Sequence, residues 1–209
     1  MPLRDVRHLP IQNGTTSHRT RPDVPAAKLD DLKAQLRIDD DSEDTYLTGL
    51  LLTASEYAAG YLALSLIETE LRRQYDMTSR GPQLQPVRFG RNVITLPLGP
   101  VTEVESVEVF DQDGDMTAIE ASDYTLDTAS QPARIYLHEY HTGREIAFLR
   151  IDYKAGYGAS AEDVPRLIQH GILMHVAYLY EHRGDCSAAT AARESGALDT
   201  YARYRVVRV

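Results

Sequence analysis

The chain has 209 residues, of which 43% are hydrophobic and 25% charged, values that are ordinary for one globular domain with extensions. Its formal net charge of −9 argues against a protein that grips nucleic acid, because phosphate binding is carried by Lys and Arg. An acidic wall repels phosphate, so this charge also fits a conduit that DNA passes without sticking, although solubility alone is the simpler explanation.

The single cysteine, Cys186, excludes an internal disulfide and a cysteine metal cluster, and it fits a reducing compartment. No apolar run approaches the length that spans a bilayer. The first residues, Met1 to Asp5, lack the apolar core of a secretory signal. The sequence therefore predicts a protein that is made and used in the cytoplasm.

The N-terminal residues 1–24 hold four Arg, two His and three Pro with little apolar periodicity, which predicts a flexible arm. A single α+β domain is expected over residues 25–185. It begins with a helix over residues 25–37, whose leucines recur at helical spacing. In the acidic run that follows, Asp41 or Ser42 is expected to cap the next helix.

The second helix, over residues 42–65, is the clearest predicted element, because its apolar side chains fall on one stripe. The three tyrosines in this stripe suit a core margin or an interface, since a tyrosine can bury its ring and keep its hydroxyl wet. The short connection predicts that the first two helices form a hairpin. The stripe consists of Tyr46, Leu47, Leu50, Leu51, Ala54, Tyr57, Ala58, Tyr61 and Leu62.

Residues 67–155 change to short alternating segments separated by turn signals. The strictest alternation of apolar and polar residues lies in 103–109 and is typical of a half-buried strand. The pair Asp113-Gly114 is a turn signal directly after it. Short strands with frequent turns predict a small antiparallel sheet rather than a parallel one.

The C-terminal part begins with a long helix predicted over residues 163–183. Residues 186–195 are small and polar, which predicts a loop or a weak helix, and residues 198–204 suit a short helix. We assign residues 186–209 as a C-terminal docking segment. The predicted fold is thus α+β, with a helical hairpin and a C-terminal long helix packed with a small antiparallel β-sheet, between extended N- and C-terminal arms.

No catalytic, cofactor or metal site is predicted. The acidic run 39–44 lacks the Gly and the distal Glu of a calcium loop. His170, His175 and His182 are five and seven residues apart, so no pair has the spacing of a helical zinc site, and His175 is expected in the core. Because nothing pairs a nucleophile or carboxylate with a base, the sequence predicts a protein that is not an enzyme.

Several strings, in this order along the chain, resemble the head–tail connector (adaptor) family of tailed phages and gene transfer agents. The resemblance covers about residues 28–209. It departs from the family at residues 80–91, which lack an expected aromatic-rich strand, and in the long N-terminal arm. The strings are Leu29 to Asp39 with the acids after it, Tyr46 to Tyr57, Ile94 to Val107, Asp123 to Asp127 with Pro132 to Ile135, Ile151 to Pro165, Leu179 to Arg183 and Tyr204 to Arg208.

The resemblance implies a ring of subunits, typically twelve, bound beneath the portal protein of a virion or phage-like particle. Such a ring extends the DNA channel, lets DNA pass without specific binding, and contacts the next neck (stopper) protein. It is assembled in the bacterial cytoplasm without membrane or cofactor. The alternatives are another neck component, such as a stopper or tail-completion protein, or a small-molecule-binding α+β domain, which would need a concave pocket.

The last five residues read Arg-Val-Val-Arg-Val, and such a β-branched segment can add to a sheet edge or groove of another chain. Its arginines can pair with carboxylates, and nearby tyrosines can anchor it. We therefore predict that this segment binds the portal, with a frayed tail as the simpler alternative. Removal of residues 201–209 is then expected to leave the thermal midpoint nearly unchanged. The predicted portal-binding residues are Tyr201, Tyr204, Arg205, Val206, Val207, Arg208 and Val209.

Overall fold

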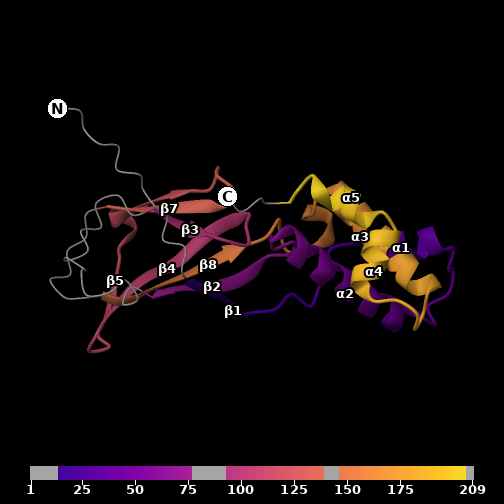
Figure 1. Cartoon of the computed structure of the whole chain (residues 1–209), viewed down its shortest axis with the longest axis horizontal. Helices are drawn as coiled ribbons and strands as arrows, with labels where there is room; N and C mark the ends of the chain where they lie inside the picture. Colours follow the sequence, from indigo (N-terminus) through magenta and orange to yellow (C-terminus); the bar gives the residue numbers. More distant parts are fainter. Residues whose placement is uncertain (1–13, 77–92, 139–145, 206–209) are drawn as a thin grey trace. The chain divides into compact units, whose positions relative to one another are not determined.

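The computed structural model describes residues 14–76, 93–138 and 146–205 (Figure 1). Its contacts divide the chain into two compact units. The β unit is made of Met1–Thr20 and Glu70–Lys154, and the helical unit of Arg21–Thr69 and Ala155–Val209. The single domain expected over 25–185 is thus two units, because the apolar stripes of the helices pack on one another and form a core cluster of helical-unit residues.

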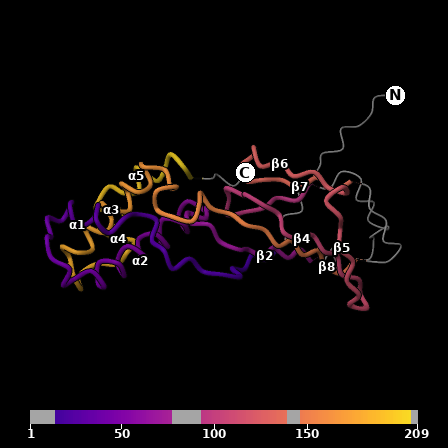
Figure 2. Tube along the Cα trace, turned by 180° about the vertical axis from the view of Figure 1, so that it is seen from behind, coloured from indigo at the N-terminus to yellow at the C-terminus, as the bar shows by residue number. Residues whose placement is uncertain are grey.

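Five α-helices form the helical unit, and α3 packs beside the other four (Figure 2). The helices predicted over 25–37, 42–65 and 163–183 are confirmed as α1, α2 and α3, each shorter than expected. Left-handed residues at Arg37 and Ala63 end the first two. The five are α1 (Leu29–Leu36), α2 (Asp44–Leu62), α3 (Arg166–Glu181), α4 (Ala188–Glu194) and α5 (Ala197–Ala202). No helix in the part of the chain that the structure describes is long and apolar enough to cross a bilayer.

The core of the helical unit lies where the stripes of α2 and α3 meet. Both helices repeat apolar residues every three or four positions, which places these side chains on one face. Leu32 of α1 adds to the same cluster. The buried stripe residues are Leu47, Leu51, Ala54, Ala58 and Leu62 on α2, with Ile168, Ile172 and Val176 on α3.

Over residues 186–195, where a loop or a weak helix was expected, the chain forms the helix α4, and α5 corresponds to the short helix expected over 198–204. The hydroxyl of Ser187 caps α4 by accepting the backbone N–H of Thr190 at 3.2 Å. α5 lies so close to α3 that a Cβ added to Gly171 would stand 2.2 Å from Oγ1 of Thr200 and 2.6 Å from Cε1 of Tyr201. Only glycine permits this approach.

Two backbone segments of the helical unit run side by side where the chain leaves for the β unit and returns from it. The N–H of Glu68 donates to the carbonyl of Gly158 at 2.7 Å, and the N–H of Tyr157 donates to the carbonyl of Leu66 at 3.3 Å. Gly156 has φ +146°, and a Cβ there would lie 2.5 Å from the backbone of Glu68. Glycine is therefore required where these two segments meet.

The described residues of the β unit form two antiparallel sheets in place of the single small sheet that was expected. The five-stranded sheet has the order β1 (Gly14–His18), β2 (Thr69–Asp76), β8 (Ile146–Ala155), β4 (Val101–Asp111) and β5 (Met116–Ala118). The three-stranded sheet has the order β3 (Val93–Leu96), β7 (Ala133–Leu137) and β6 (Tyr124–Asp127). Single 3₁₀ turns precede β6 at Ala121–Asp123 (η2) and, in the helical unit, α3 at Ala161–Asp163 (η3).

Strand β1 corrects part of the flexible arm expected over 1–24. It pairs with β2 in the register Gly14↔Tyr75 and Thr16↔Arg73. The segment is rich in Thr and Ser, and threonine favours strands. It has no apolar periodicity, which is why a strand was not predicted there. Residues 1–13 lie outside the described residues.

The two faces of β8 differ sharply. Leu149, Ile151 and Tyr153 are buried on one face, as strand alternation requires. The hydroxyl of Tyr153 donates to the carbonyl of Pro97 at 2.7 Å, which ties the five-stranded sheet to the end of β3. The intervening residues of β8 point to the opposite face and form ion pairs with neighbouring strands.

Candidate interaction surfaces

The predicted portal-binding residues, at the end of the docking segment 186–209, begin inside the helical unit. Tyr201 is 0% exposed, Tyr204 is half-buried and Arg205 is exposed. Residues 206–209 lie outside the described residues. The described portal-binding residues therefore belong to the folded helical unit, and they differ in how far each is exposed.

Tyr201 belongs to the core of the helical unit. Its ring lies 6.2 Å from the ring of Tyr61 on α2 and abuts Gly171 on α3. Burial raises the pKa of its hydroxyl, which has no hydrogen-bond partner among the described residues. Tyr201 thus offers no exposed ring to a partner, and removing it would open the core. Because of this burial, we now expect loss of residues 201–209 to destabilise the helical unit, in place of the unchanged thermal midpoint expected from the sequence.

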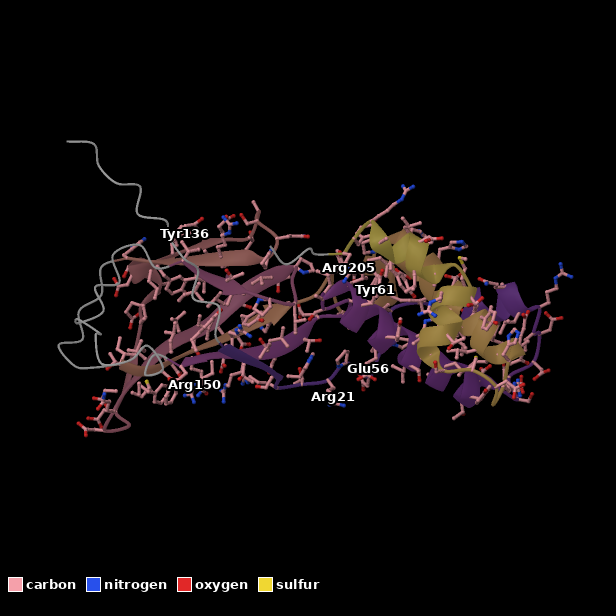
Figure 3. All side chains as sticks on the ribbon, in the orientation of Figure 1. Arg21, Glu56, Tyr61, Tyr136, Arg150 and Arg205 are labelled. Atoms are coloured by element: carbon pink, nitrogen blue, oxygen red, sulfur yellow. The ribbon has the colours of Figure 1, made fainter. Side chains whose placement is uncertain are left out.

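The backbone after α5 is held in place at Arg205. The N–H of Tyr204 donates to the carbonyl of Tyr201 at 2.9 Å, and the Tyr204 ring packs against the helical core. The Arg205 guanidinium lies over the ring of Tyr61, 5.2 Å from its centroid, and Figure 3 shows the two side chains together. This is the geometry of a cation–π contact.

A second surface, here called the tyrosine–arginine cluster, consists of Glu43, Tyr46, Tyr180 and Arg183. Arg183 lies 4.8 Å from the ring centroid of Tyr46 and 4.2 Å from that of Tyr180. The same guanidinium donates to both carboxylate oxygens of Glu43 at 2.8 and 3.0 Å. The Tyr46 ring is 41% exposed. An exposed aromatic face with its arginine already fixed is the composition typical of protein interfaces.

Glu43 also corrects the predicted cap of α2. The N-cap position is occupied by Glu43 rather than Asp41 or Ser42, and no side chain caps the helix. The Glu43 carboxylate instead accepts hydrogen bonds from the hydroxyl of Tyr180 and from Arg183, and these bonds lower its pKa. The carboxylates of Asp41 and Asp44 instead form ion pairs with Nζ of Lys33, at 2.5 and 2.8 Å.

The outer face of the five-stranded sheet carries a network of ion pairs. Arg72 and Asp152 join β2 to β8, while Arg150 and Glu108 join β8 to β4 at 2.6 Å. Arg19, just after β1, reaches Glu105 at 2.6 Å. The network matches each cation with a carboxylate, so this face is stabilised by pairing although the chain as a whole is acidic.

Neither a metal site nor a catalytic site was predicted from the sequence, and the structure describes residues 14–76, 93–138 and 146–205. In these ranges no group of three His, Cys, Asp or Glu is placed to hold a metal ion. His175 lies in the core, as expected, and its Nε2 is 2.8 Å from the carbonyl oxygen of Ala188. Its Nδ1 is buried without a hydrogen-bond partner there.

Comparison with known proteins now bears on these surfaces. The family model described as phage gp6-like head-tail connector protein matches residues 26–97. A chain from the virion of a native gene transfer agent particle is 26% identical, with a TM-score of 0.67, over 93% of this chain and 97% of that chain. The head–tail connector model thus matches the part of this chain from residue 26 to residue 97, and the similarity to a gene transfer agent chain extends over nearly all of it.

Two further solved structures are similar to this chain. One comes from the neck of an empty gene transfer agent particle computed with C6 symmetry, with a TM-score of 0.67 and 25% identity. The other comes from the neck of a native particle computed with C12 symmetry, with a TM-score of 0.63 and 26% identity. Each match covers 93% of this chain and 97% of the other. A search of the curated proteins finds no match.

The sequence indicated only part of these surfaces. The helix stripe singled out Tyr46 and Tyr61 as residues for a margin or interface, and both lie at partly exposed contacts with arginine. The pairing of Glu43 with Arg183 was missed, because the two residues are 140 positions apart. The only signal for it was the presence of Arg183 in a string that resembles the family.

Proposed function

We propose that this chain is a head–tail connector (adaptor) subunit in the neck of a gene transfer agent or phage particle. Copies of it form a ring beneath the portal, which extends the DNA channel and joins head to tail. The observation that carries the proposal is the structural similarity to a chain in the neck of a gene transfer agent particle. The match covers 93% of this chain and 97% of the compared chain. The activity is assembly, with no bond chemistry.

The symmetry of the similar necks supports a ring of twelve copies. A structure with C12 symmetry and one with C6 symmetry both contain a chain of this fold. A closed cyclic ring uses two different surfaces of each subunit, one for each neighbour. The tyrosine–arginine cluster is one surface whose composition suits such a contact.

The charge of the chain suits passage of DNA rather than binding. A formal net charge of −9 repels phosphate, so DNA can traverse the ring without being held. We expect no measurable affinity of the isolated protein for duplex DNA at physiological salt. Micromolar binding with a steep salt dependence would contradict this part of the proposal.

The C-terminal segment is proposed to dock on the portal. Tyr204 and Arg205 are the last described residues of the chain, and Val206, Val207, Arg208 and Val209 follow in the sequence. The buried ring of Tyr201 anchors the start of these residues in the core of the helical unit. The support is the β-prone, arginine-bearing sequence together with its fixed starting point, since an extended segment gains main-chain hydrogen bonds on a partner's edge or groove.

The proposal is tested by reconstitution with the portal encoded beside this chain. The purified protein is expected to self-associate weakly alone and to form a closed ring once portal is added. Light scattering gives the mass in each case, and electron microscopy of the complex gives the symmetry. A stable dimer that ignores portal would overturn the connector reading. Binding only to a preformed neck would identify a stopper or tail-completion protein instead.

A further inference from the structure

The C-terminal ten residues differ in charge from the rest of the chain. Residues 200–209 contain Arg203, Arg205 and Arg208 and no Asp or Glu, whereas the chain as a whole has a formal net charge of −9. A cationic segment at the end of an acidic protein is attracted by carboxylates of a partner and repelled by cationic surfaces. The segment therefore selects its receptor by charge.

The contact between Arg205 and Tyr61 fixes where this charge is presented. Tyr61 is itself held, because its ring packs against the buried ring of Tyr201 at 6.2 Å. Arg205 lies 5.2 Å above Tyr61. An arginine held over a ring keeps its in-plane N–H groups for a carboxylate, to which it can bind through two parallel hydrogen bonds.

We propose that the receptor of the C-terminal segment is a carboxylate-bearing surface of the portal, and that Tyr61 is a positioning residue which holds Arg205 ready for it. This inference rests on the proposed function, in which the segment docks on the portal. Tyr61 acts only through Arg205. It reduces the number of conformations that the arginine must give up on binding, which strengthens association without a new contact.

The receptor chemistry is tested by measuring the Kd of the full chain for portal at several salt concentrations. Arg205→Gln and Arg208→Gln are each expected to weaken binding about tenfold at low salt, as for loss of a charge-assisted hydrogen bond. Both are also expected to reduce the salt dependence of Kd. The matched control is Arg193→Gln, an exposed arginine on α4 that loses the same charge and is expected to bind as wild type.

The role of Tyr61 is tested with two variants. Tyr61→Phe keeps the aromatic face and is expected to bind portal as wild type does. Tyr61→Leu keeps apolar packing but removes the ring, and it is expected to weaken binding about threefold, the size of an exposed cation–π contact. In the Arg205→Gln background the two Tyr61 variants are expected to bind equally, which a purely structural role of Tyr61 would not produce.

The outcomes separate the inference from the proposed function. Wild-type binding that does not change with salt, or tail variants that bind like Arg193→Gln, overturns the carboxylate receptor while docking itself stands. Equal affinity of Tyr61→Leu and Tyr61→Phe in the otherwise wild-type chain overturns the positioning role. If the wild-type chain does not bind portal at any salt concentration, the proposed function fails, and this inference falls with it.

Discussion

Arg72 and Asp152 form a two-pronged ion pair between the adjacent strands β2 and β8. Nε and Nη2 of the arginine lie 2.7 Å from Oδ1 and Oδ2 of the carboxylate. The Asp152 side chain is only 9% exposed, and its pair with Arg72 lowers the pKa of the carboxyl below its usual 3.8. The ion pair therefore stabilises the deprotonated carboxylate of Asp152 in the folded sheet.

Replacing this carboxylate is expected to weaken the fold in a pH-dependent way. Asp152→Asn should lower the free energy of unfolding by roughly 1–3 kcal/mol at pH 7, because Arg72 loses a charged partner. Because the pKa of Asp152 is lower in the folded chain than in the unfolded chain, where it is 3.8, the ion pair contributes its full stability above pH 3.8. This stability is lost as the pH falls through the pKa of the folded chain. Urea unfolding at pH 7 and pH 3 measures the difference. Glu56→Gln, an exposed carboxylate on α2, is the control. An equal deficit at both pH values would contradict the ion-pair explanation.

His175 predicts a loss of stability in mild acid. Burial lowers its pKa below 6.5, although its bond to the Ala188 carbonyl opposes the shift. The unfolded chain takes up a proton near pH 6.5 while the folded chain does not, so stability is complete above that pH and falls below it. We expect His175 to account for a loss of stability as the pH falls from 7.5 to 5.5. His175→Gln should flatten this part of the profile, whereas exposed His170→Gln should not. Identical profiles would refute the assignment.

The close approach of α3 and α5 at Gly171 leaves no room for a larger side chain at this position. Gly171→Ala should destabilise the helical unit by roughly 1–3 kcal/mol, because the new methyl group meets the ring of buried Tyr201. The matched control is Gly60→Ala on α2, where a Cβ meets nothing within 4 Å and the better helix former should stabilise. Thermal unfolding compares the two. A neutral Gly171→Ala would show that α5 shifts away without loss.

Two truncations separate the core from the docking segment. Removal of residues 206–209 is expected to keep the thermal midpoint within a few degrees and to weaken portal binding. Removal of residues 201–209 deletes the buried Tyr201 ring and should cost about 3–5 kcal/mol. Calorimetry and a portal binding assay distinguish them. Full portal affinity after the shorter truncation would argue against the docking segment.

The helices were predictable because their stabilising signal is local. In α2 and α3 the apolar residues recur at the period of the helix itself, so the stripe of α2 around Leu47 and Leu51 is visible without knowing what covers it. The strands of the β unit were foreseen as a class for the same reason. Their division into two sheets depends on pairings such as Ile94 with Ile135, which local alternation does not encode.

The candidate site was predicted less well because its signals compete. The alternation of Arg and Val in residues 205–209 suggested an extended segment, and that reading was carried back to Tyr201. The buried position of Tyr201 depends on Gly171, thirty residues earlier, which admits its ring against α3. A six-residue helix such as α5 gains its stability from this tertiary packing rather than from propensity, so no pattern within it revealed its role.

The side-by-side segments at Leu66–Glu68 and Tyr157–Gly158 make residues 70–154, the larger part of the β unit, an insertion in the topological sense, whereas its residues 1–20 precede the helical unit in the chain. The backbone leaves the helical unit and re-enters it at neighbouring points, where Glu68 and Gly158 are already hydrogen-bonded at 2.7 Å. A turn of a few residues can bridge such a gap. Evolution can therefore lengthen, exchange or shorten the inserted strands, from β2 to β8, by changes confined to one stretch of the gene, while the helical core keeps both of its halves.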